Sequence, residues 1–108
     1  MRDMVVKFAA LSSAVAIGAG AFGAHAASGQ AIDWLRTGAM YQLVHATAAI
    51  LVVSLDRRAA MVLLVGAAIF AFSLYAMAVG GPRWLGAVTP VGGLAMISGW
   101  LMIAFRPR

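Results

Sequence analysis

Four long stretches of the chain contain no Asp, Glu, Lys or Arg, and they constrain its fold more than any other feature. They cover residues 8–32, 37–55, 59–82 and 84–105 of a 108-residue chain. Each stretch is able to supply the roughly 20 apolar residues with which an α-helix crosses a bilayer. Only 10% of the residues are charged and 64% are hydrophobic, whereas a soluble domain has about 25% and 45–50%. The sequence therefore predicts an integral membrane protein.

We expect an all-α fold, in which residues 1–108 form a single domain, a bundle of four transmembrane helices. The expected helices cover residues 6–25, 38–55, 59–80 and 85–105. Gly80, Gly81 and Pro82 should end the third helix, because this combination does not sustain helical hydrogen bonding. Pro90 lacks an amide hydrogen, so we expect a kink or a fresh helix start near Thr89. Residues 27–36 are expected to form a connector with an interfacial turn before the second helix.

Basic residues are distributed unequally between the two ends of these helices. Positive charges close to transmembrane segments stay preferentially on the cytoplasmic side. On a four-helix path the side of the termini carries Arg2, Lys7, Arg57, Arg58, Arg106 and Arg108, and the opposite side carries Arg36 and Arg83. This asymmetry predicts that both termini are cytoplasmic. Because the basic residues occur in ones and twos and form no stripe, the net charge of +5 does not indicate nucleic-acid binding.

The first hydrophobic segment allows two interpretations. Small residues recur at every fourth position, at Ser12, Ala16, Gly20 and Ala24, and such a stripe lets a neighbouring helix approach closely. Residues 1–26 also have the basic start, apolar run and Ala-His-Ala ending of a cleavable signal peptide. Its removal would leave three hydrophobic segments with unchanged orientations, so the membrane assignment does not depend on the choice.

A few polar side chains inside the apolar stretches form the candidate site. Tyr41, Gln42 and His45 are spaced i, i+1 and i+4, so they lie on adjoining parts of one helix face. Polar groups in lipid have to face protein or water, and this face should therefore point into the bundle. Threading the segments through one bilayer gathers the candidates toward its outer side: His25, Tyr41, Gln42, His45, Ser73, Tyr75 and Thr89. We expect a polar network or pocket in that leaflet.

Two functions are compatible with such a network. In the first, the side chains satisfy one another, and the chain is a non-enzymatic structural or accessory membrane protein, in a homo-oligomer or a larger complex. In the second, the same residues bind a small solute or a lipid in a transporter-like protein. A void of several hundred cubic ångströms among them would favour binding, and direct hydrogen bonds would favour the structural role. Membrane lipids are the expected surroundings in either case.

The residue types argue against metal, cofactor and catalytic chemistry. The chain has no cysteine, and neither a carboxylate nor a thiol accompanies His25 and His45 inside the apolar stretches, so we predict no metal or haem site. No acidic residue is placed to orient a nucleophile and base, and we predict no enzymatic activity. The first helix also lacks the glutamate that small multidrug-resistance antiporters use. A redox or metal protein is a third alternative that a visible spectrum would settle.

Several motifs resemble one family of small membrane proteins. They are residues 20–26 (Gly-Ala-Phe-Gly-Ala-His-Ala), 37–46 (Thr-Gly-Ala-Met-Tyr-Gln-Leu-Val-His-Ala), 72–75 (Phe-Ser-Leu-Tyr), 89–93 (Thr-Pro-Val-Gly-Gly) and 99–100 (Gly-Trp). In order and spacing the chain resembles the DUF423 family, which includes the bacterial UPF0382 proteins and is related to mitochondrial transmembrane protein 256. The resemblance implies a four-helix protein of the cytoplasmic membrane and implies no activity, substrate or cofactor. Gly38 departs from the family pattern, in which Thr-Ala often follows Thr37.

Overall fold

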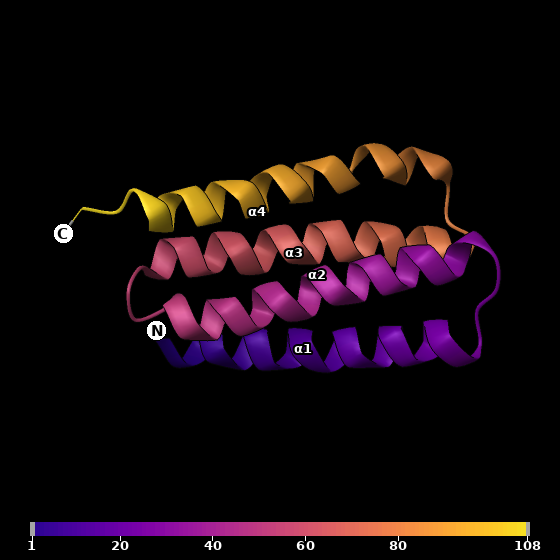
Figure 1. The fold of residues 1–108 in the computed structure, drawn as a ribbon, viewed down its shortest axis with the longest axis horizontal. Coiled ribbons are helices and arrows are strands. Elements are labelled where there is room, and N and C mark those ends of the chain that lie inside the picture. Colours follow the sequence, from indigo (N-terminus) through magenta and orange to yellow (C-terminus); the bar gives the residue numbers. More distant parts are fainter. Residues whose placement is uncertain (1, 108) are drawn as a thin grey trace.

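The computed structural model describes residues 2–107 and is all-helical over that range. Its elements are α1 (Arg2–His25), α2 (Gln30–Val52), α3 (Arg57–Ala78), the short 3-10 helix η1 (Arg83–Ala87) and α4 (Thr89–Ala104). The four α-helices lie side by side in chain order, each antiparallel to the one before it, and both ends of the chain lie at the same end of the molecule (Figure 1). We call this the terminal end. The opposite end, with the α1–α2 and α3–α4 connections, is the far end.

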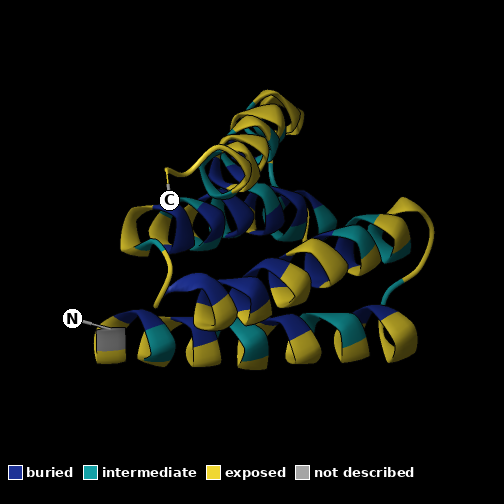
Figure 2. Cartoon of the chain, turned by 60° about the vertical axis from the view of Figure 1, so that its left-hand side comes forward, coloured by how far each residue is buried: buried dark blue, intermediate teal, exposed yellow. Residues whose placement is uncertain are grey.

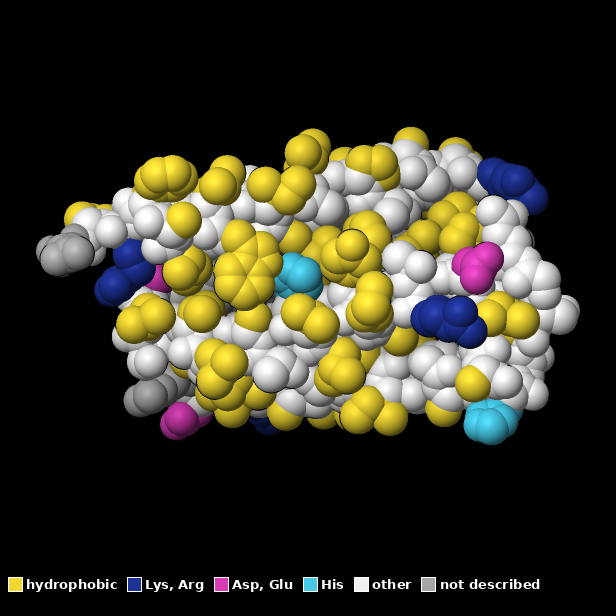
Figure 3. Space-filling view, in the orientation of Figure 1, with side chains coloured by type: hydrophobic (Ala, Val, Ile, Leu, Met, Phe, Trp, Pro, Cys, Tyr) yellow, Lys and Arg dark blue, Asp and Glu magenta, His cyan; other side chains and the backbone are white. Residues whose placement is uncertain are grey.

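Within the described residues, three segments are long and apolar enough to cross a membrane. They are Asp3–His25, Arg57–Ala78 and Arg83–Ala104. The helix α2 is less apolar, because its first turns carry Gln30, Asp33 and Arg36 and its middle carries further polar residues. In the face shown in Figure 3, charged side chains lie toward the two ends and hydrophobic side chains cover the region between them. The expected all-helical membrane fold is thus confirmed for three spans.

The second helix begins eight residues earlier than expected, and this corrects both its predicted bounds of 38–55 and the connector at 27–36. Gly29, with a φ of +63°, makes the turn out of α1, and α2 starts at Gln30 and ends at Val52. Leu35 is buried against α1, where a Cβ added at Gly23 would lie 3.0 Å from the Leu35 Cβ. The charged residues of these turns stay exposed. Charge marks where a chain enters the membrane, but an amphipathic helix continues past that boundary.

Backbone chemistry ends α3 and restarts the chain as expected. Gly80 has a φ of +100°, which side-chain-bearing residues rarely adopt, and Pro82 follows it. The expected fresh start near Thr89 is confirmed, because α4 begins there with Pro90 in its first turn. In that position the missing amide hydrogen removes no helical hydrogen bond. The expected bounds of 59–80 and 85–105 for the last two helices therefore become 57–78 and 89–104.

Small residues bring neighbouring helices into contact. The stripe on α1 faces α2, where Ala16 is fully buried and a Cβ added at Gly20 would lie 3.6 Å from the Ala39 Cβ. On the other side of α3, Gly66 and Gly92 bring α4 close. Each helix buries the face it turns to its neighbours and exposes the other (Figure 2). The apolar core therefore follows the row of helices, and it holds α2 between α1 and α3.

Candidate functional site

The most completely buried polar side chain is Gln42, at the middle of α2. It has no exposed surface, and both ends of its amide are hydrogen-bonded. The Gln42 Oε1 accepts a hydrogen bond from the Tyr75 hydroxyl of α3 at 2.7 Å, and the Gln42 Nε2 donates one to the Ser12 Oγ of α1 at 2.9 Å. One side chain thus connects three helices by neutral hydrogen bonds.

Gly38 allows the Tyr75 ring to reach this position. Side chains on a helix lean toward its N-terminus, so Tyr75 points from the far part of α3 toward the middle of the molecule. Its ring passes over Gly38, where an added Cβ would lie 2.7 Å from the Tyr75 Cε1 and 3.4 Å from the Ala71 Cα. Gly38 therefore has a structural role, because a side chain at this position would meet the Tyr75 ring.

A second hydrogen bond, closer to the terminal end, joins α2 to α4. The Trp100 Nε1 donates to the His45 Nε2 at 3.0 Å, and the rings meet edge to face with their centroids 5.8 Å apart. The His45 Nδ1 lies 2.8 Å from the Tyr41 carbonyl oxygen. Because an indole nitrogen only donates and a carbonyl only accepts, the imidazole carries its hydrogen on Nδ1. His45 is therefore held as one neutral tautomer.

A third pair lies near the far end of the molecule. The Ser73 hydroxyl of α3 donates to the Phe70 carbonyl oxygen at 2.8 Å and is hydrogen-bonded to the Thr89 hydroxyl. Thr89 is the first residue of α4, so this pair fixes the point at which α4 starts beside α3.

The seven predicted residues do not form one hydrogen-bonded cluster, which corrects the expectation of a single network, while the side of the membrane that they occupy stays a prediction. Gln42 pairs with Tyr75, and Ser73 pairs with Thr89. His45 bonds to the Tyr41 carbonyl and to Trp100, which is outside the predicted set. His25 is exposed at the end of α1. The early start of α2 is the reason, because it places His45 about 15 residues and roughly 22 Å from the far end of that helix.

The structure also changes the membership of the site. Tyr41 contributes its carbonyl oxygen, while its side chain is 40% exposed and its ring packs on Phe70 at a centroid distance of 4.9 Å. Sequence reasoning missed Ser12 and Trp100 as partners. The signal available for Ser12 was its place in the small-residue stripe, and for Trp100 it was an indole donor inside an apolar helix.

The predicted polar side chains contact one another and the backbone, and among the residues they bond to only Ser12 borders one of the cavities described next. Three cavities of about 350, 280 and 130 Å³ lie along the helices, and none of the seven predicted residues lines any of them. Within residues 2–107 every buried side-chain nitrogen and oxygen has a hydrogen-bond partner. The two histidines are separated by most of the length of α2. The hydrogen bonds between the polar side chains are therefore able to fix the positions of the helices relative to one another.

Comparison with known proteins identifies the family. Residues 19–93 match the family described as "Protein of unknown function (DUF423)". The UPF0382 inner membrane protein YgdD of Escherichia coli is 35% identical, covering 94% of this chain and 86% of the relative. The UPF0382 membrane protein YwdK of Bacillus subtilis is also 35% identical, covering 87% of each chain. A UPF0382 membrane protein of Haemophilus influenzae is 32% identical, covering 97% and 94%. No solved structure matches the chain. The expected resemblance is thus confirmed: the chain belongs to the DUF423 family of UPF0382 membrane proteins.

Proposed function

We propose that this chain is a non-enzymatic structural or accessory component of the cytoplasmic membrane, in which interhelical hydrogen bonds hold four transmembrane helices in one arrangement. The observation that supports this most directly is Gln42, a fully buried amide whose two ends bond to α1 and α3. A ligand-binding amide would need a free donor or acceptor facing a void. The small-solute alternative therefore has less support from the geometry.

A topological argument supports α2 as the fourth span. The helices α1 and α3 run in the same direction along the molecule (Figure 1), and both are long and apolar enough to cross a bilayer. The chain must return across the membrane between them, and α2 is the helix that joins the end of one to the start of the other. Its buried polar residues Gln42 and His45 face protein, so crossing does not expose them to lipid.

Cysteine labelling tests this topology with both termini in the cytoplasm. The chain has no cysteine, so single substitutions report without background. We expect a membrane-impermeant maleimide to label Ser28→Cys, in the far-end turn, in intact cells. We expect it to label Leu55→Cys, in the terminal-end turn, only after the membrane is permeabilised. Reversed labelling would overturn the orientation, and labelling of both sites from one side would overturn the crossing of α2.

Replacing His45 by alanine tests the structural role of the network. The change leaves the Trp100 indole N–H without its partner. Trp100 is 41% exposed, so within a membrane the unpaired N–H would lie partly in hydrocarbon, and a lost hydrogen bond there costs about 1–2 kcal/mol. We expect a loss of about 1–2 kcal/mol in the free energy of unfolding, measured by titration with dodecyl sulfate in mixed micelles. Thr47→Ala is the matched control, because Thr47 is exposed and bonds only within α2, to the Leu43 carbonyl. Equal stability of the two variants would contradict the role of His45.

Gentle detergent extraction tests the accessory role. We expect the chain to elute in size-exclusion chromatography with a second copy or another protein at fixed stoichiometry, identified by mass spectrometry. A monomer that elutes without any protein companion would contradict an accessory role and leave a solely structural role in the membrane.

A further inference from the structure

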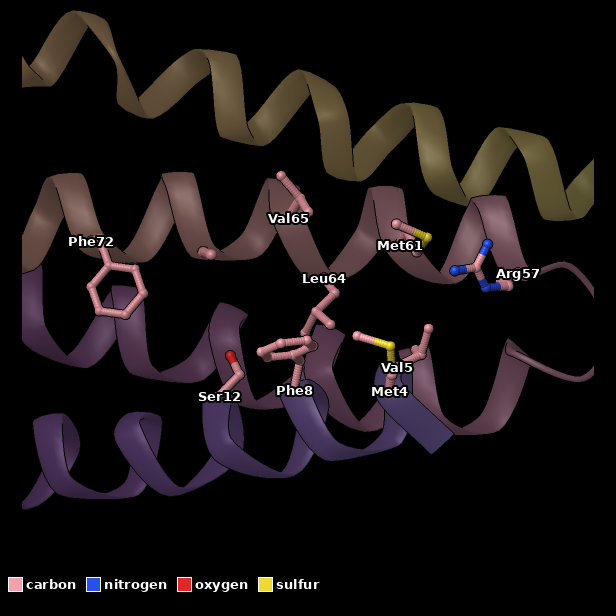
Figure 4. Close-up of a pocket in the computed structure, with 10 residues that line it drawn as sticks. Met4, Val5, Phe8, Ser12, Arg57, Met61, Leu64, Val65 and Phe72 are labelled. Atoms are coloured by element: carbon pink, nitrogen blue, oxygen red, sulfur yellow. The ribbon is translucent and has the colours of Figure 1, made fainter. Parts of the chain in front are cut away.

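A groove between α1 and α3 is the largest of the three cavities, and Ser12 is the one member of the hydrogen-bonded network that lines it. Its volume is about 350 Å³, and its walls include Met4 and Phe8 of α1 and Leu64 and Phe72 of α3 (Figure 4). Arg57, the first residue of α3, lies at one end of the groove (Figure 4). Apart from the Ser12 hydroxyl, the groove is therefore apolar along its length, with a cation at its terminal end.

The length of this α1/α3 groove along the helices corresponds to the thickness of one leaflet of a bilayer. From Arg57 to Phe72 it follows α3 for about 22 Å at 1.5 Å per residue. One leaflet has about 15 Å of hydrocarbon, and each headgroup region adds roughly 5–7 Å. With Arg57 at the level of the headgroups, the groove therefore ends near the middle of the bilayer.

The charge at the mouth of the groove selects among lipids. The terminal end carries more basic than acidic side chains, because Asp3 and Asp56 also lie there, and this gives it a positive potential. The exposed basic residues are Lys7, Arg57, Arg58 and Arg106. Positive side chains at a membrane surface attract anionic lipids, by about 1 kcal/mol each. A guanidinium also forms paired hydrogen bonds with phosphate oxygens, which an ammonium group does not.

We propose that the α1/α3 groove binds one anionic phospholipid from the leaflet at the terminal end, with an acyl chain between the helices and its phosphate on Arg57. A second copy of this chain is a poorer occupant. The walls are formed by large side chains such as Phe8 and Phe72, whereas close helix contacts in membranes use small ones.

Native mass spectrometry of the full-length protein tests the headgroup contact. The protein is exchanged into micelles with equal amounts of phosphatidylglycerol and phosphatidylethanolamine, and the lipids retained per chain are counted. We expect Arg57→Gln to lower the preference for phosphatidylglycerol about five-fold. Arg58→Gln is the matched control, because it removes the same charge one residue away but does not line the groove. We expect it to change the preference less than two-fold. Equal effects of the two variants would overturn the proposal, because they would indicate general surface potential only.

A second pair of variants tests the acyl chain. Ala68 lines the groove, and Ala68→Phe should fill it and abolish the retained lipid, whereas Ala14→Phe, on the exposed surface of α1, should retain it. Circular dichroism and the unfolding midpoint identify any variant that fails to fold. If Ala68→Phe does not fold, the comparison of Arg57→Gln with Arg58→Gln tests the proposal. Retention of lipid by folded Ala68→Phe would overturn the proposal. It would also be overturned if Ala68→Phe converted a dimer into a monomer and left the retained lipid unchanged, because the groove would then bind a second copy of the chain. Neither Arg57 nor Ala68 contributes to the polar network, so this test is independent of the structural role proposed above.

Discussion

Replacing Gly92 by alanine should separate α4 from α3 and lower the free energy of unfolding by about 3 kcal/mol, the upper end of the usual cost of overpacking. Gly92 is buried where the two helices come closest. A Cβ added there would lie 2.6 Å from the Gly66 carbonyl oxygen and 2.8 Å from the Phe70 Cα. These are backbone atoms, so a rotamer change cannot relieve the overlap. Either the helices move apart or the contact is lost.

The neighbouring glycine supplies the control for this prediction. A Cβ added at Gly93 would meet only the Phe70 Cδ1, at 4.0 Å, so Gly93→Ala has room. Because alanine favours helix more than glycine, we expect Gly93→Ala to be neutral or to stabilise by up to about 1 kcal/mol. Unfolding in dodecyl sulfate measures both variants. The contact shown between α3 and α4 would be contradicted if Gly92→Ala were as stable as Gly93→Ala.

Movement of α4 should also be visible at Trp100. This residue lies two turns beyond Gly92 on the same helix, and its indole donates to His45. In Gly92→Ala we expect the tryptophan near-ultraviolet circular dichroism to resemble that of His45→Ala. If Gly92→Ala lost much stability but its tryptophan spectrum were unchanged, the substitution would not have moved α4 at Trp100.

Replacing Gln42 by alanine is expected to have the second large effect, a loss of about 4 kcal/mol. Truncating a fully buried side chain of this size leaves a cavity, and such changes cost about 2–5 kcal/mol in protein cores. The substitution also leaves the hydroxyls of Ser12 and Tyr75 without their partner, at a further cost that membrane measurements place near 1 kcal/mol each. Unfolding in dodecyl sulfate, followed by circular dichroism, measures the loss.

Two further variants separate the contributions at this position. Gln42→Leu keeps most of the volume and removes only the hydrogen bonds, so we expect it to lose about 1–2 kcal/mol. Gln30→Ala removes an exposed glutamine from the first turn of α2 and should stay within about 0.5 kcal/mol of the parent. If Gln42→Leu were more stable than the parent, apolar packing and not hydrogen bonding would hold α1, α2 and α3 together.

Part of the site could be predicted from residue spacing. Gln42 and His45 were identified as inward-facing because polar groups in an apolar helix must be satisfied by protein, and both are buried. Their partners could not be predicted in the same way. The pairing of Gln42 with Ser12 and Tyr75, and of His45 with Trp100, joins positions that are at least 30 residues apart in the chain. Which residues meet depends on the register between helices, and register follows from where each helix begins.

The amino-acid sequence by itself determined the membrane class, the all-helical fold, the breaks at Gly80 and Pro90 and the family, because hydropathy, backbone chemistry and motifs are local properties. Only the tertiary structure decided that α2 begins at Gln30, that the polar residues separate into three groups, and that a groove opens between α1 and α3. The physical reason is that these features depend on close packing between helices. That packing is set by small residues such as Gly38 and Gly92, whose effect becomes visible only when the opposing backbone or ring is in place.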